Sequence, residues 1–206
     1  MKKFWKLAVP LLLLAAMFAV YRVSPDSRLM YSDIAGHWAR EEILTWSQRG
    51  VMSGTDGKFR PDAGVTRAEL ATVLTRVLPL EDAAENTFTD VEEDAWYTEA
   101  VLRCVAAGIL DGGGTELAPK AYLSREEGFL MIARAIGLEP AEELSLLGGY
   151  NDAKLLSDGA KPYFEALLEQ NLISGGSEVQ LYPRQGMTRG EVAAALQKLC
   201  DAGYID

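Results

Sequence analysis

Apolar residues recur at every third or fourth position in six segments of the chain, which is the spacing of a helix with one buried face. Three of these segments begin with Thr or Ser followed three residues later by Glu. This is the sequence of a capping box, so helices are expected to start at Arg67, Arg125 and Arg189. The other three segments, near 38–46, 96–105 and 163–168, end at a residue that tolerates left-handed backbone: Gly50, Gly108 and Asn171.

The six predicted helices form three helix–loop–helix units with the same internal spacing. A proline follows the residue that ends the first helix after 11, 11 and 12 residues, and an arginine follows each proline by six. Each unit also opens with an aromatic residue, a polar residue, an acid and an apolar residue. The sequence therefore predicts a mainly α fold of three repeated units, over 31–80, 88–137 and 150–201.

Residues 1–24 have a different pattern, because three lysines precede an apolar run of about 15 residues over 7–21. This order of regions is typical of a secretory signal peptide, and the run is shorter than the about 20 residues of a spanning helix. Ala19 could precede a cleavage site, but Met17 occupies a position where small residues are preferred. Two interpretations stay open, a cleaved signal peptide and a retained membrane anchor. In both, the rest of the chain is exported.

Charge narrows the classes of partner. The chain has 20 basic and 30 acidic residues, and four of the basic residues lie in 1–24, so the remainder carries a net charge of −14. Such a surface disfavours nucleic acid and anionic lipid as main partners. Cys104 and Cys200 lie in apolar segments, where two buried thiols are the first interpretation and a disulfide is the second.

Enzyme chemistry has little support in the sequence. His37 is the only histidine, has no partner at a catalytic spacing and is interpreted as a helix-start residue. The glycine run at 112–114 lacks the lysine of a phosphate-binding loop, and no pair of carboxylates is singled out by its spacing. The sequence implies no catalytic residue, no metal and no cofactor.

The repeated motifs resemble the S-layer homology (SLH) domain over residues 31–200. The first unit is closest to the family pattern, and its matching segments are the opening Tyr31-Ser32-Asp33, His37-Trp38-Ala39, the turn at Gly50, Phe59-Arg60-Pro61-Asp62 and Thr66-Arg67-Ala68-Glu69. The second unit departs at Ser124-Arg125-Glu126-Glu127, and the third unit has no tryptophan. The resemblance implies three units in a pseudo-three-fold, mainly helical prism.

The resemblance also implies a function, which is attachment to the cell envelope by binding secondary cell-wall polysaccharide in grooves between units. The glycan is expected to be acidic, often through a pyruvylated sugar, and the protein to lie at the cell wall or cell surface. The family pattern carries glycan-binding roles to the arginines Arg67, Arg125 and Arg189, the aspartates Asp33, Asp90 and Asp152, the tryptophans Trp38 and Trp96, and the glycines Gly54, Gly112 and Gly175.

The chemistry of the arginines agrees with that role. At the first position of a helix, a guanidinium is expected to point outward beside free backbone N–H groups and to bind a carboxylate. Unit one keeps every part of the pattern, so Arg67 is expected to be the strongest contact. Alternatives stay open: the arginines could brace neighbouring carboxylates, the tryptophans could be core residues, the aspartates could hold turns, and the units could be an envelope protein-interaction module with vestigial grooves.

The first testable prediction concerns export. Because of the lysine-rich start and the apolar run over 7–21, we expect the rest of the chain to lie outside the cytoplasmic membrane. N-terminal sequencing of the native protein separates the two interpretations, since a mature terminus near Val20 indicates cleavage and an intact terminus indicates an anchor. Recovery of the protein in the cytosol alone would contradict both.

Overall fold

The computed structural model describes residues 31–112, 114–173 and 176–206, and in these ranges it is helical with isolated β-bridges and no strand. Two short 3-10 helices, η2 (Leu147–Gly149) and η3 (Ala153–Leu155), precede the last pair of α-helices. The six α-helices are α2 (Arg40–Gln48), α3 (Arg67–Val77), α4 (Thr98–Ala106), α5 (Arg125–Ala135), α6 (Lys161–Glu169) and α7 (Arg189–Asp201). The prediction of six main helices is confirmed.

The apolar segment 1–24 lies outside the described residues. Within the ranges that the structure does describe, no helix is long and apolar enough to cross a membrane.

Capping boxes start the second helix of each unit, as the sequence predicts. Thr66, Ser124 and Thr188 each accept a hydrogen bond from the N3 amide, and the N3 glutamate accepts one from the N-cap amide. The ends of the first helices are also confirmed, since the residues at 50, 108 and 171 have φ values of 73°, 69° and 55°. The chain therefore turns sharply into each loop.

The starts of the first helices differ from the prediction. Asp94 and Asp158 precede α4 and α6 and are of a residue type that often caps helices, but the N-cap residues are Tyr97 and Ala160, and neither caps through its side chain. Asp158 instead pairs with Lys161 at 2.7 Å. Turns precede α2 and α4, which start two residues after their apolar segments begin, whereas α6 starts at Lys161, before its segment near 163–168.

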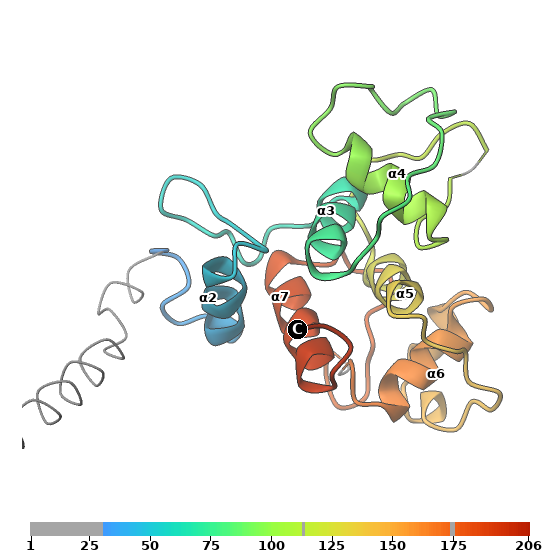
Figure 1. Cartoon of the computed structure of the whole chain (residues 1–206). Helices are drawn as coiled ribbons and strands as arrows, with labels where there is room; N and C mark the ends of the chain where they lie inside the picture. Colours follow the sequence, from blue (N-terminus) through green and yellow to red (C-terminus); the bar gives the residue numbers. More distant parts are fainter. Residues whose placement is uncertain (1–30, 113, 174–175) are drawn as a thin grey trace, which may run out of the picture.

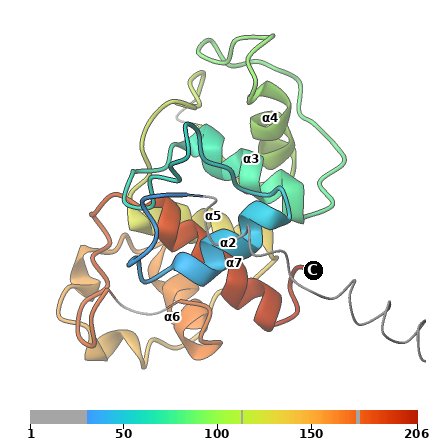
Figure 2. The ribbon, with the colours of Figure 1, turned by 90° about the vertical axis from the view of Figure 1, so that its left-hand side faces the viewer.

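Helix packing follows a cyclic order. The second helix of each unit packs against the first helix of the next unit, so α3 lies on α4, α5 on α6 and α7 on α2 (Figures 1 and 2). The buried apolar side chains form one continuous cluster across all three units. Since each unit buries its apolar face against a neighbour, the units depend on one another for their core.

Three main-chain hydrogen bonds close this order into a ring. Val65 N–H donates to Met187 O, Met187 N–H donates to Leu123 O, and Leu123 N–H donates to Val65 O, each with an N···O distance of 2.9 Å. All three residues are buried. Each lies just before the N-cap of a second helix, so the ring fixes where α3, α5 and α7 begin.

The loop of each unit is held by the aspartate that opens the unit. The Asp33 carboxylate accepts from the amides of Phe59 and Arg60 at 2.9 and 2.8 Å, and Asp90 accepts from Leu117 and Ala118 at 2.9 and 2.7 Å. Burial alone would raise the pKa of both aspartates, but these amide hydrogen bonds outweigh it and lower the pKa below its ordinary value. Both carboxylates therefore stay ionised at neutral pH.

Asp152 makes the same contacts in unit three, with the amides of Leu181 and Tyr182 at 2.9 and 2.8 Å. The second amide in each unit belongs to a residue with positive φ: Arg60, Ala118 and Tyr182. The interpretation of the three aspartates as turn-holding residues is confirmed.

The arginine at the start of each second helix reaches the loop of the next unit from the other side. Its Nε donates at 2.9 Å to the carbonyl of the residue whose amide the aspartate holds: Arg67 to Leu117, Arg125 to Leu181 and Arg189 to Phe59. Each loop is therefore held by an aspartate of its own unit and an arginine of the preceding unit. These contacts connect each unit to the next one around the ring.

We predict that Arg125→Ala destabilises the fold by about 3 kcal/mol or more. Its guanidinium is 6% exposed, and its loss leaves both the Leu181 carbonyl and the partly buried Glu191 carboxylate without this donor. Arg184→Ala is the matched control, because Arg184 is 64% exposed and lies 3.7 Å from Glu126, so its loss should cost less than about 1 kcal/mol. Chemical denaturation of both variants measures the difference, and equal stabilities would contradict the bracing role.

We also predict that Gly54→Ala destabilises the fold by about 1–3 kcal/mol, because an added Cβ would lie 2.1 Å from the Lys58 carbonyl oxygen across the loop. Gly36→Ala serves as the control, since a Cβ there meets nothing within 4 Å. Thermal unfolding compares the two. A Gly54→Ala protein as stable as Gly36→Ala would show that the loop can relax.

Candidate functional site

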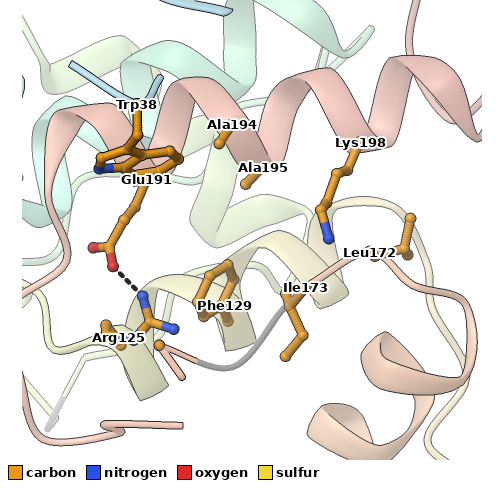
Figure 3. A pocket seen from close by; sticks show the side chains of 10 residues that line it. Trp38, Arg125, Phe129, Leu172, Ile173, Glu191, Ala194, Ala195 and Lys198 are labelled. Atoms are coloured by element: carbon orange, nitrogen blue, oxygen red, sulfur yellow. Dashed lines mark hydrogen bonds and ion pairs between the residues drawn. The ribbon is translucent and has the colours of Figure 1, made fainter. Parts of the chain in front are cut away.

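A groove bordered by α5 and α7 has a volume of about 450 Å³. We call it groove A. Figure 3 shows the Arg125–Glu191 pair and Trp38 at one end and Lys198 at the other, with apolar side chains between them. Its lining residues are Trp38, Arg125, Phe129, Leu172, Ile173, Gly176, Glu191, Ala194, Ala195 and Lys198.

A second hollow, groove B, has a volume of about 100 Å³. Several of its lining residues occupy the same positions of the repeat as residues that line groove A. Arg189 takes the place of Arg125, Glu69 that of Glu191, Arg76 that of Lys198 and Trp96 that of Trp38. The complete lining of groove B is Val51, Met52, Ser53, Glu69, Thr72, Val73, Arg76, Trp96 and Arg189. The two grooves are thus related by the repeat, although groove B is much narrower.

Each groove is assembled from all three units. One unit contributes the arginine, the next contributes the capping glutamate, the loop and the second helix, and the remaining unit contributes the tryptophan. Trp38 and Arg67 belong to the same unit, but they do not line the same groove. The cyclic packing places Trp38 with Arg125 and Trp96 with Arg189.

We call the remaining interface, between units one and two, interface C. At the positions that are equivalent to those of grooves A and B, it has Arg67, Glu127 and Arg134. Gly159 occupies the tryptophan position, directly before the N-cap of α6. Asp111 occupies the position of Ser53, and its carboxylate lies 3.5 Å from Arg134. Arg67, the arginine expected to be the strongest contact, therefore lies at the interface that has no indole and has an added carboxylate.

The arginines do not point outward, which corrects the expectation from the sequence. The side chains of Arg67 and Arg125 are 16% and 6% exposed. The amides at the helix starts are occupied as well, since Arg67 N–H donates to Ala121 O and Ala68 N–H to Pro119 O, and the other two helices repeat this. The loop of the next unit fills the place where a free anion was expected.

A guanidinium and a carboxylate also lie together at the interfaces. Arg125 pairs with Glu191 in groove A, and Arg67 lies 3.8 Å from Glu127 at interface C. Burial lowers the pKa of the Arg189 guanidinium below its ordinary value, while the charge of Glu69 favours the protonated form. Because these glutamates also cap helices, the electrostatics of the grooves are fixed by the same residues that start the second helices.

The two tryptophans are surface residues. Trp38 and Trp96 are 65% and 68% exposed, so the interpretation of them as core residues is wrong. His37 supports Trp38 from one side, with 5.3 Å between the ring centroids, and is itself held by Asp62 at 3.3 Å and by the amide of Ala39 at 3.1 Å. The interpretation of His37 as a helix-start residue is confirmed.

Three cations that the sequence analysis did not single out lie nine residues after the arginines. Arg76 donates to Val51 O at 2.7 Å, Lys198 donates to Asn171 O at 3.1 Å, and Arg134 faces Asp111. Burial lowers the pKa of Lys198 below its ordinary value. The sequence shows the equal spacing of these three cations, but only the structure shows that Arg76 and Lys198 line equivalent grooves.

The remaining predicted residues that the structure describes hold the loops of the units and do not line the grooves. The three aspartates accept hydrogen bonds from loop amides. An added Cβ on Gly112 would lie 2.4 Å from the Glu116 carbonyl oxygen, a close approach across the loop like that of Gly54 to Lys58. Gly175 lies outside the described residues. Both cysteines are free thiols: Cys104 is buried, which raises its pKa to about 12, whereas Cys200 is only partly buried.

The sequence of this chain is similar to parts of larger known proteins. Relatives include the surface-layer 125 kDa protein of Lysinibacillus sphaericus, 32% identical over 173 residues, and the exoglucanase XynX of Acetivibrio thermocellus, 30% identical over 175. These alignments cover 82% and 83% of this chain but only 14% and 16% of the relatives. The S-layer protein sap of Bacillus anthracis is 28% identical over 167 residues, which is 80% of this chain and 20% of that protein.

The family model for the S-layer homology domain matches residues 31–71, 87–127 and 149–193, one match in each predicted unit. Domains of this family attach proteins to the cell wall, which places the chain at the cell wall or cell surface. The chain belongs to the S-layer homology family.

Proposed function

We propose that this chain attaches non-covalently to the cell envelope by binding an acidic, pyruvylated cell-wall polysaccharide in grooves A and B. The observation that carries the proposal is that an exposed indole and a largely buried guanidinium face the same apolar groove, at the same positions of the repeat, at two interfaces. A surface tryptophan beside a buried cation has no evident structural need, because the core is complete without the indole.

The groove chemistry suits a sugar that carries a carboxylate. An indole offers a flat apolar face to a sugar ring, and guanidinium and ammonium groups bind carboxylates by charge-assisted hydrogen bonds. In groove A, Arg125 and Lys198 lie at opposite ends of an apolar floor that includes Phe129 and Ala195 (Figure 3). This local positive charge allows an acidic protein to bind an acidic polymer, since interactions in a partly desolvated groove are screened less than those at the surface.

The differences among the three interfaces give an order of affinity. Groove A has the larger volume and both elements of the motif, while groove B has the motif in a narrower hollow. Interface C has Gly159 in place of tryptophan, and Asp111 there would repel an acidic ligand and occupies Arg134. We therefore place the binding in A first and B second, and expect little at C.

An envelope protein-interaction module is the second candidate function. It is favoured by exposed aliphatic side chains in unit three and in the connection that precedes it: Leu144, Leu146, Leu155 and Val179. Removal of the wall polysaccharide separates the two functions, because only the first depends on that polymer.

We predict that Trp38→Ala and Trp96→Ala each weaken binding to purified cell-wall sacculi by about three- to tenfold, the loss expected for one aromatic face. Both indoles are exposed, so the thermal unfolding temperature should not change. Trp38→Ala should have the larger effect, and the double variant should lose most of the binding.

Tyr122→Ala is the matched control, because Tyr122 is 72% exposed and lines neither groove. It should bind as the unchanged protein does. Binding that survives removal of the secondary polymer from the sacculi, or tryptophan variants that bind normally, would refute the glycan function.

A further inference from the structure

Unit three contains a further hollow, which we call pocket D, with a volume of about 560 Å³. One wall comes from the connection between units two and three, and the others come from the end of α6 and the residues that follow it. Its lining residues are Leu146, Gly149, Tyr150, Leu168, Asn171, Ile173, Ser177 and Glu178.

Pocket D adjoins groove A. Ile173 lines both, and the segments 171–173 and 176–178 contribute residues to each of the two hollows. Lys198 lies at the far end of groove A from Trp38 (Figure 3). It donates to the carbonyl of Asn171, which lines pocket D. A ligand that lies along groove A and passes Lys198 therefore arrives at the edge of pocket D.

The wall of pocket D is held in place by a buried carboxylate. Glu165 is 0% exposed and accepts hydrogen bonds from the Ser145 amide at 2.8 Å, the Ser145 hydroxyl at 3.0 Å and the Leu147 amide at 2.9 Å. Burial alone would raise the pKa of Glu165, but these donors outweigh it and lower the pKa below its ordinary value. The connection next to Leu146 is thus a fixed surface, as a preformed binding site requires.

The side chains of pocket D differ from those of groove A in charge. Leu146, Leu168 and Ile173 are apolar, Tyr150 is aromatic, and Asn171, Ser177 and Glu178 supply an amide, a hydroxyl and a carboxylate. No cation lines the pocket among the described residues, so an acidic group is disfavoured there. Apolar faces combined with an amide and a carboxylate suit the ring and hydroxyls of an uncharged sugar.

We propose that pocket D is a second saccharide subsite, occupied by the uncharged sugar residue that follows the acidic sugar bound in groove A. The inference rests on the proposed glycan function and extends it, because the ligand becomes an oligosaccharide segment and not a single acidic sugar. Only unit three would have such a subsite, since it alone follows the connection that forms the wall.

The test compares ligand lengths on the full chain by calorimetry. The probes are a pyruvylated monosaccharide and oligosaccharides of two to four sugars that end in it. We expect the longer probes to bind the unchanged protein about tenfold more tightly than the monosaccharide does. In the double variant Asn171→Gly with Glu178→Ala this preference should fall to about twofold or less, while the affinity for the monosaccharide stays the same.

The substitutions are chosen to preserve the fold. Glycine suits the left-handed backbone of Asn171 and occupies the same position in the other two units, as Gly50 and Gly108. Leu146→Asp is an independent variant, because Leu146 is 44% exposed and a carboxylate there should also reduce the length preference. Gly50→Asn is the matched control in unit one, where an added Cβ meets nothing within 4 Å, and should leave the preference unchanged.

The outcomes separate the two proposals. Equal binding of short and long probes by the unchanged protein, or an unchanged preference in the pocket variants, overturns the subsite and leaves groove A intact. Failure of every probe to bind the unchanged protein overturns the glycan function and the subsite with it.

Discussion

The ring of main-chain hydrogen bonds among Val65, Leu123 and Met187 is the constraint on which the rest of the structure depends. It places the starts of α3, α5 and α7 side by side and turns the arginine that follows each N-cap toward the loop of the next unit. The loop is held from the opposite side by its own aspartate. Each unit therefore supplies half of the support for its neighbour, and no unit has a complete loop or a complete core alone.

The ring also explains why the grooves mix residues from three units. The second helix that lines a groove packs against the first helix of the next unit, so the turn that precedes this first helix lies beside the groove. Trp38 precedes α2, which packs on α7, and reaches groove A in this way, although it lies 87 residues from Arg125 in the sequence. The arginine and the tryptophan of one groove therefore come from different units.

Local features of the fold were predictable from the sequence. The capping boxes fixed the starts of α3, α5 and α7, and the residues at 50, 108 and 171 fixed the ends of the first helices, because both depend on hydrogen bonds or backbone angles within a few residues. The roles of His37 and the opening aspartates also followed from local rules.

The composition of the grooves was not predictable in the same way. The burial of Arg125 and the exposure of Trp38 depend on which unit follows which around the ring. The repeat pattern in the sequence does not specify this order, because the same pattern is compatible with either direction around the ring. Pocket D lies beyond prediction for a related reason, since its wall is an irregular connection held by Glu165 from within α6.

The double attachment of the arginines has a consequence for comparing members of this family. An arginine that holds the loop of the next unit is needed even in an interface that we propose does not bind the glycan, as with Arg67 beside Gly159 and Asp111. Its presence in a sequence therefore reports that the repeat is intact. The residue just before the N-cap of the first helix is tryptophan in two units and glycine in the third. Because this residue does not hold a loop, its identity is the feature that should distinguish an interface proposed to bind the glycan from one that does not.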